Sequence, residues 1–131
     1  EPGKDQGREV TSERQPEARR EYLPDERQAV VQKFSVEGHD GYFVVGLYPD
    51  GRPGELFIHT AKLGSTVSGF ADAWAMAVSL LLQSGVPVSK IADMFSGTRF
   101  EPFGRTTDPE IPTCSSIIDL ACAWMEMRFV K

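Results

Sequence analysis

The segment from residue 41 to residue 62 constrains the fold of this chain most strongly. It contains two apolar runs rich in β-forming residues, at residues 42–48 and 56–58, and the turn-forming residues 49–54 lie between them. This pattern is typical of an antiparallel hairpin. An earlier run with Val30, Phe34 and Val36 precedes a loop at residues 38–41. Neither connection has room for a crossover helix, so we expect a three-stranded antiparallel meander.

A strongly apolar segment then leads to Gly85 and Pro87, which are typical of a helix end. Five of its apolar side chains recur at helical spacing: Phe70, Trp74, Ala77, Val78 and Leu81. Apolar residues on the other faces predict that this helix is mostly buried in the core. It is too short, and too often interrupted by polar residues, for a membrane span.

Two further helices are expected. The first is short, over residues 86–95, and the last runs from about residue 112 to residue 128. Residues 96–112 are rich in Gly, Pro and Thr, which predicts a long irregular loop. The predicted fold class is therefore α+β, with a three-stranded antiparallel β-meander packed against two or three helices.

Residues 1–27 hold eight acidic and six basic side chains and few apolar ones, so we expect a charged flexible linker or tail. Residues 28–131 are expected to form a single α+β domain. The chain does not begin with Met, which favours an excerpt of a longer protein.

Composition narrows the classes of partner. The net charge of −5 argues against nonspecific binding to nucleic acid or to an anionic membrane. Charged residues stand where a secretory signal needs apolar ones, which favours a cytoplasmic protein. Cys114 and Cys122 both fall in the predicted last helix, too far apart to bridge, and are expected to be buried thiols.

The residues indicate no catalytic centre and no metal site. The chain has only two histidines, and no serine or cysteine stands in a recognisable nucleophile pattern. One anion or nucleotide site is conceivable where a loop opens the long helix, because free N–H groups and hydroxyls there can bind phosphate. Its candidates are Arg52, Lys62, Gly64, Ser65, Thr66 and Arg99. The alternative, which we favour, is that Ser65 or Thr66 caps the helix and the arginines pair with Glu101 or Glu110.

Many short motifs at fixed spacings place this chain beside a known family. They are Gly38-His39-Asp40-Gly41-Tyr42, Asp50-Gly51-Arg52-Pro53-Gly54-Glu55-Leu56-Phe57-Ile58, Gly64-Ser65-Thr66, Gln83-Ser84-Gly85-Val86-Pro87, Arg99-Phe100-Glu101-Pro102 and Ser116-Ile117-Ile118-Asp119. From about residue 23 to residue 129 the chain resembles the C-terminal accessory region, called TSCPD, of adenosylcobalamin-dependent (class II) ribonucleotide reductases. The Thr-Ser-Cys-Pro-Asp string itself is absent, and residues 113–116 resemble it only loosely.

The resemblance implies a parent enzyme that makes deoxyribonucleotides for DNA synthesis by radical chemistry. Its adenosylcobalamin and reducing cysteines belong to a separate barrel domain and a terminal tail, so no cofactor is expected on this chain. The family has apolar residues where Cys114 and Cys122 stand, which assigns both cysteines to the core.

Two functions follow. The first is an accessory domain that is non-catalytic alone and contacts the catalytic barrel, in the same or a separate polypeptide. The second is a stand-alone regulatory module that binds nucleotides, anions or proteins. The small sheet also leaves room for a homo-oligomer.

Overall fold

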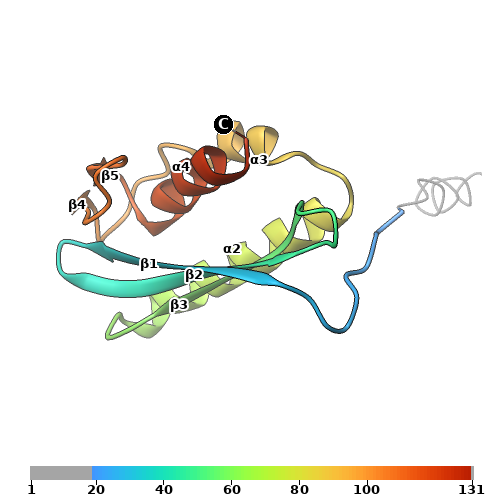
Figure 1. Cartoon of the computed structure of the whole chain (residues 1–131). Coiled ribbons are helices and arrows are strands. Elements are labelled where there is room, and N and C mark those ends of the chain that lie inside the picture. Colours follow the sequence, from blue (N-terminus) through green and yellow to red (C-terminus); the bar gives the residue numbers. More distant parts are fainter. Residues whose placement is uncertain (1–18, 131) are drawn as a thin grey trace, which may run out of the picture.

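Three strands form the antiparallel sheet that the sequence predicts (Figure 1). The computed structural model describes residues 19–130. The strands are β1 (Ala29–Val36), β2 (His39–Leu47) and β3 (Pro53–Thr60), in the order β1-β2-β3. β1 and β2 meet through the short turn at residues 37 and 38, and the turn at residues 48–52 joins β2 to β3. The predicted meander is confirmed.

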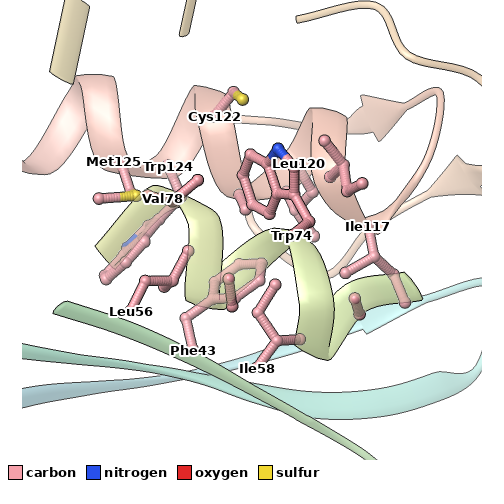
Figure 2. Packing of buried hydrophobic residues seen from close by; sticks show 14 of the residues in the cluster. Phe43, Leu56, Ile58, Trp74, Val78, Ile117, Leu120, Cys122, Trp124 and Met125 are labelled. Atoms are coloured by element: carbon pink, nitrogen blue, oxygen red, sulfur yellow. The ribbon is translucent and has the colours of Figure 1, made fainter. Parts of the chain in front are cut away.

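Three helices complete the α+β fold: α2 (Ser65–Gln83), α3 (Val88–Phe95) and α4 (Ile117–Phe129). α2 runs beside β3, and α3 packs against α4. The core lies between α4, α2 and the inner face of the sheet (Figure 2). There the Phe43 ring stacks on Phe34 at 4.4 Å and on Trp124 at 5.4 Å, which ties β1, β2 and α4 together.

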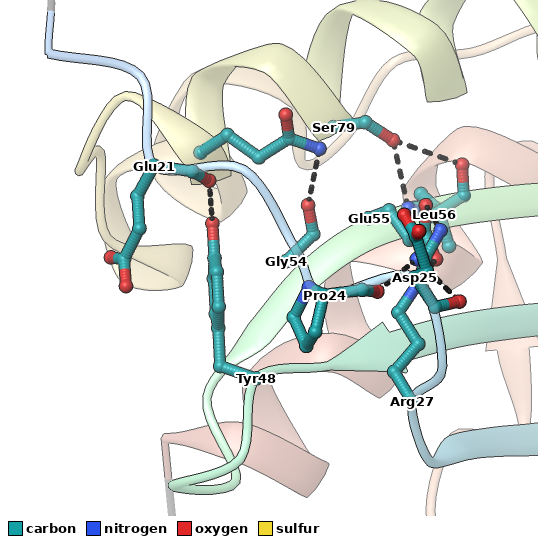
Figure 3. A network of polar contacts seen from close by, with 10 residues as sticks. Glu21, Pro24, Asp25, Arg27, Tyr48, Gly54, Glu55, Leu56 and Ser79 are labelled. Carbon is teal, nitrogen blue, oxygen red and sulfur yellow. Dashed lines mark hydrogen bonds and ion pairs between the residues drawn. The ribbon is translucent and has the colours of Figure 1, made fainter.

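The edge of β3 that faces away from β2 is closed by a side chain of α2. The Ser79 hydroxyl accepts a hydrogen bond from the Leu56 backbone N–H at 2.8 Å and lies 3.2 Å from the Leu56 carbonyl oxygen (Figure 3). Since unpaired backbone groups at a sheet edge are costly to bury, this contact fixes α2 against β3.

The prediction that the long helix is mostly buried is wrong. Trp74 and Val78 lie in the core, but Phe70 and Ala77 are exposed. The physical reason is that α2 is apolar on all sides, whereas only one of its faces packs against the sheet and α4. Helical spacing alone could not identify which face that is.

The last third of the chain also differs from the prediction. The expected irregular loop contains β4 (Gly104–Arg105), which pairs with β5 (Thr113–Cys114). α4 begins later than expected, after Ser116, whose hydroxyl accepts a hydrogen bond from the Asp119 N–H. Cys114 therefore lies in a strand rather than in the last helix. Both cysteines are buried, as expected.

Residues 19–27, at the end of the predicted linker, lie against the domain. The Glu21 N–H donates to the Gln83 carbonyl. The Tyr48 hydroxyl donates to the Glu21 carbonyl (Figure 3). Arg27 forms an ion pair with Glu55 at 2.6 Å. The rest of the predicted linker lies outside the described residues, and the domain boundary at residue 27 stays a prediction.

Candidate functional site

The start of α2 holds four of the predicted anion-site residues. Lys62 has a left-handed backbone (φ 60°), and Gly64 is the N-cap residue. Because glycine has no side chain, no side chain accepts a hydrogen bond at this helix end, and the first turn contains no acidic residue. Ser65 and Thr66 are exposed. The expectation that Ser65 or Thr66 caps the helix is therefore wrong, since both lie inside it.

Arg52 lies far from this group. It stands in the turn between β2 and β3, whereas Lys62 follows the other end of β3, and an eight-residue strand separates the two by about 26 Å. Its guanidinium forms ion pairs with Asp50 at 2.7 Å and Glu21 at 3.2 Å and lies over the Tyr48 ring. Hydrogen bonds from Arg52 lower the pKa of Asp50. Arg52 thus stabilises the turn between β2 and β3 and is not part of the group at the start of α2.

Arg99 belongs to a loop that approaches the start of α2 from another side. Its guanidinium lies 4.0 Å from the centre of the Phe103 ring. Phe103 lines a cavity of about 490 Å³ together with Leu63 and Val67, which flank the first turn of α2. The rim of that cavity carries His39 and two acidic side chains, Glu37 and Glu101. The structure therefore brings the Arg99 loop near Lys62 and residues 64–66, in acidic surroundings.

The described residues hold little that could perform covalent chemistry. Burial raises the pKa of the Cys122 thiol to about 12 and also raises the pKa of Cys114. Both thiols therefore stay protonated near neutral pH, where only a thiolate is a good nucleophile. Within residues 19–130, no group of three or more His, Cys, Asp and Glu side chains could hold a metal ion.

A second surface lies on the outer face of the sheet, where sequence reasoning favours packing of Phe57 under the helices but the structure leaves it 46% exposed. Val31, Val44 and Phe57 pair across the three strands on the outer face of the sheet, away from α4. Met76 and Leu80 of α2 line a cleft with Phe57. The signal was present in the period-two pattern of the strands, because Val31, Val44 and Phe57 alternate with the core residues of their own strands.

Comparisons with known proteins cover nearly the whole chain. The profile of the TSCPD domain matches residues 14–129. Three vitamin B12-dependent ribonucleotide reductases are similar: that of Rhodopirellula baltica is 50% identical over 86% of this chain. Those of Bradyrhizobium diazoefficiens and Streptomyces avermitilis are 45% and 42% identical over 76% and 85% of it.

The chain spans only a small part of these relatives. It covers 11% of the Rhodopirellula baltica enzyme, 8% of the Bradyrhizobium diazoefficiens enzyme and 12% of the Streptomyces avermitilis enzyme. No solved structure matches the fold. Because the profile accounts for most of its residues, this chain belongs to the TSCPD domain family.

Proposed function

We propose that this chain is an accessory domain of a vitamin B12-dependent ribonucleotide reductase. The observation that carries the proposal is the 50% identity to such an enzyme over 86% of this chain, which is only 11% of the enzyme's length. The reduction of ribonucleotides to deoxyribonucleotides would then take place in the remaining part of the polypeptide. This domain would support that part as a non-catalytic, cytoplasmic unit.

The chemistry of the domain's own side chains supports a non-catalytic role. A cysteine that relays electrons exchanges disulfides as a thiolate and must be accessible. Cys122 is 2% exposed, and Cys114 is 8% exposed. With their raised pKa values, neither thiol suits a redox relay.

Cobalamin does not fit the residues of this domain. A corrin ring with its nucleotide tail is larger than a drug-sized ligand, whose pockets reach about 1,000 Å³. The cavity that His39 lines is about 490 Å³ and carries Glu37 and Glu101 at its rim. His59 lies on the outer face of the sheet and is exposed. We therefore assign the cofactor to the rest of the parent enzyme, and we place no step of its chemistry on this chain.

Two measurements test the proposal. The reading frame that encodes this chain should also encode a catalytic barrel, or a neighbouring frame should. The 131-residue chain, incubated with adenosylcobalamin, a dithiol and a ribonucleotide, should form no deoxyribonucleotide, whereas the complete reductase should. Turnover by the 131-residue chain alone would contradict the proposal.

A second candidate function is binding of an anion or nucleotide at the start of α2. The observation in its favour is that this helix end has neither a side-chain cap nor an acidic residue in its first turn, so its N–H groups and positive dipole end are uncompensated. The acidic rim formed by Glu37 and Glu101 weighs against it.

Titration with inorganic phosphate and with nucleotides tests this second function. Binding should shift the backbone amide signals of residues 64–69 at millimolar ligand, and Lys62→Glu should abolish the shift. Lys90→Glu on α3 is the matched control, since it changes the net charge equally at another helix. Unshifted amide signals would end this candidate.

A further inference from the structure

Apolar side chains on the outer face of the sheet and on the outer face of α2 form a surface that meets at one cleft. We call it the outer surface and define it by Val31, Val44, Phe57, Met76 and Leu80. The first three lie in one row across β1, β2 and β3, because Val31 pairs with Val44 and Val44 pairs with Phe57. Phe57, Met76 and Leu80 line one cleft of about 300 Å³ between β3 and α2, which also has polar lining residues: Arg20, Glu55, Ser79 and Gln83. The apolar side chains of the sheet and of the helix therefore meet at this cleft.

Much of this surface is in contact with solvent. Met76 is 73% exposed, Val31 61% and Phe57 46%. Single exposed apolar residues are ordinary, but a contiguous apolar patch usually marks an interface. Lys33 and His59 lie on the same outer face toward one end of the sheet and are exposed, which gives the apolar centre a polar rim. Protein interfaces have this arrangement.

The face that carries the outer surface has about the size of an interface. The whole outer side of the sheet, three strands of about 26 Å at a spacing of about 4.8 Å, and a helix strip of about 28 Å by 10 Å together cover roughly 650 Å², of which the outer surface is the apolar part. A stable interface of standard size buries about 800 Å² on each partner. Filling the cleft between β3 and α2 would add to the buried area.

We infer that the outer surface docks onto another domain of the same reductase polypeptide, through an apolar patch on that domain. The inference rests on the proposed function. Since the chain is 11% of the length of the Rhodopirellula baltica enzyme, most of such a polypeptide lies outside this domain. A covalently linked domain is present at a local concentration of about millimolar, which favours it over a second molecule. The net charge of −5 of the whole chain further disfavours a second copy of this chain.

A lipid membrane fits the outer surface less well. By length and apolar composition alone α2 would suffice for a membrane span, so the expectation that this segment is too short and too polar for one is wrong. However, Trp74 and Val78 on its inner face are packed in the core, and Ser79 bonds to the backbone of β3. The helix could enter a bilayer as a span only by breaking these contacts.

Two methionines of the wild-type domain provide a test with its own control. Met76 lies on the outer surface, and Met94 lies on α3 and is similarly exposed at 67%. The complete reductase is oxidised briefly with dilute hydrogen peroxide, and sulfoxide at each methionine is measured by peptide mass spectrometry. If docking leaves about 10% of the molecules open, Met76 should oxidise about tenfold more slowly than Met94. Equal oxidation rates would overturn the inference.

Variants of the complete reductase test the surface itself. Phe57→Glu, or Val31→Glu if the first fails to fold, should raise the oxidation rate of Met76 to that of Met94. Tyr22→Glu, at an exposed aromatic residue outside the outer surface, should leave Met76 protected. Protection of Met76 that disappears on dilution would overturn the inference in favour of a second copy. Protection of Met76 that appears only when phospholipid vesicles are added would also overturn the inference, in favour of docking to a membrane.

The docking inference and the proposed function can fail separately. Ribonucleotide reduction by the complete polypeptide tests the proposed function and does not depend on the exposure of Met76. An active reductase with an unprotected Met76 would remove the docking inference alone. If no reductase domain is encoded with this chain, the proposed function fails first.

Discussion

At the scale of single residues, one substitution should have opposite effects at two glycines. A Cβ atom at Gly41 would lie 2.6 Å from the His59 carbonyl oxygen and would also overlap the Phe34 ring, whereas a Cβ at Gly69 in α2 would meet nothing within 4 Å. We expect Gly41→Ala to lower the free energy of unfolding by about 1–3 kcal/mol through overpacking. Gly69→Ala should raise it by about 0.5–1 kcal/mol, because alanine is the better helix former. Urea denaturation measures both, and a neutral Gly41→Ala would contradict the packing of β1 on β2.

Cys122 should make the stability of the domain depend on alkaline pH. Burial raises the pKa of its thiol from 9.0 to about 12. Between these values the unfolded chain has released the proton and the folded protein has kept it, so the free energy of unfolding falls as the pH rises from 9 to 12. The decline should be smaller for Cys122→Ala. Parallel pH profiles of the wild type and this variant would show that the thiol is not buried as described.

At the scale of the elements, the contact between α2 and β3 depends on one hydroxyl. Ser79→Ala removes the acceptor of the Leu56 N–H and leaves buried backbone groups without a partner. We expect a loss of about 1–3 kcal/mol in the free energy of unfolding. Ser84→Ala, at an exposed serine just after α2, is the control and should change it by less than about 0.5 kcal/mol. Equal denaturation midpoints for the two variants would exclude this role of Ser79.

The elements also show what the sequence could reveal. The meander was predictable, because turn residues separate runs of β-forming residues and the connections are too short for a crossover. β4 and β5 were not, because two-residue strands carry no periodicity and depend on pairing between residues far apart in sequence. The exposure of Phe70 could not be predicted, because Phe70 and Trp74 are one helical turn apart, lie on nearly the same side of α2 and are equally apolar. Trp74 is buried whereas Phe70 is 65% exposed, a difference along the helix that helical spacing does not encode.

The candidate anion site was predictable only where its residues are neighbours in sequence. Lys62 and residues 64–66 lie together because they form one connection, and no spacing could reveal that Arg52 lies at the opposite end of β3. Nor could composition reveal that Arg52 is engaged by Asp50 and Glu21. Long-range placement is set by the sheet register, which a single sequence specifies only weakly.

At the scale of the whole molecule, the boundary of the folded unit can be tested by truncation. We compare a chain that begins at residue 19 with one that begins at residue 28. The shorter chain lacks the Glu21 hydrogen bonds to Gln83 and Tyr48, the ion pair of Arg27 with Glu55, and Leu23, which lies against Gly54.

Each lost hydrogen bond is worth about 1 kcal/mol, and the entropy of ordering the segment offsets part of the total. We therefore expect the shorter chain to be about 1–3 kcal/mol less stable in urea denaturation. Tyr48→Phe in the longer chain should show a fraction of that loss, because it removes only the hydrogen bond to the Glu21 carbonyl. Equal stability of the two truncated chains would support the predicted boundary at residue 27. A loss in the expected range would extend the folded unit to residue 19. Residues 19–27, which bond to the C-terminal end of α2, would then belong to the domain itself.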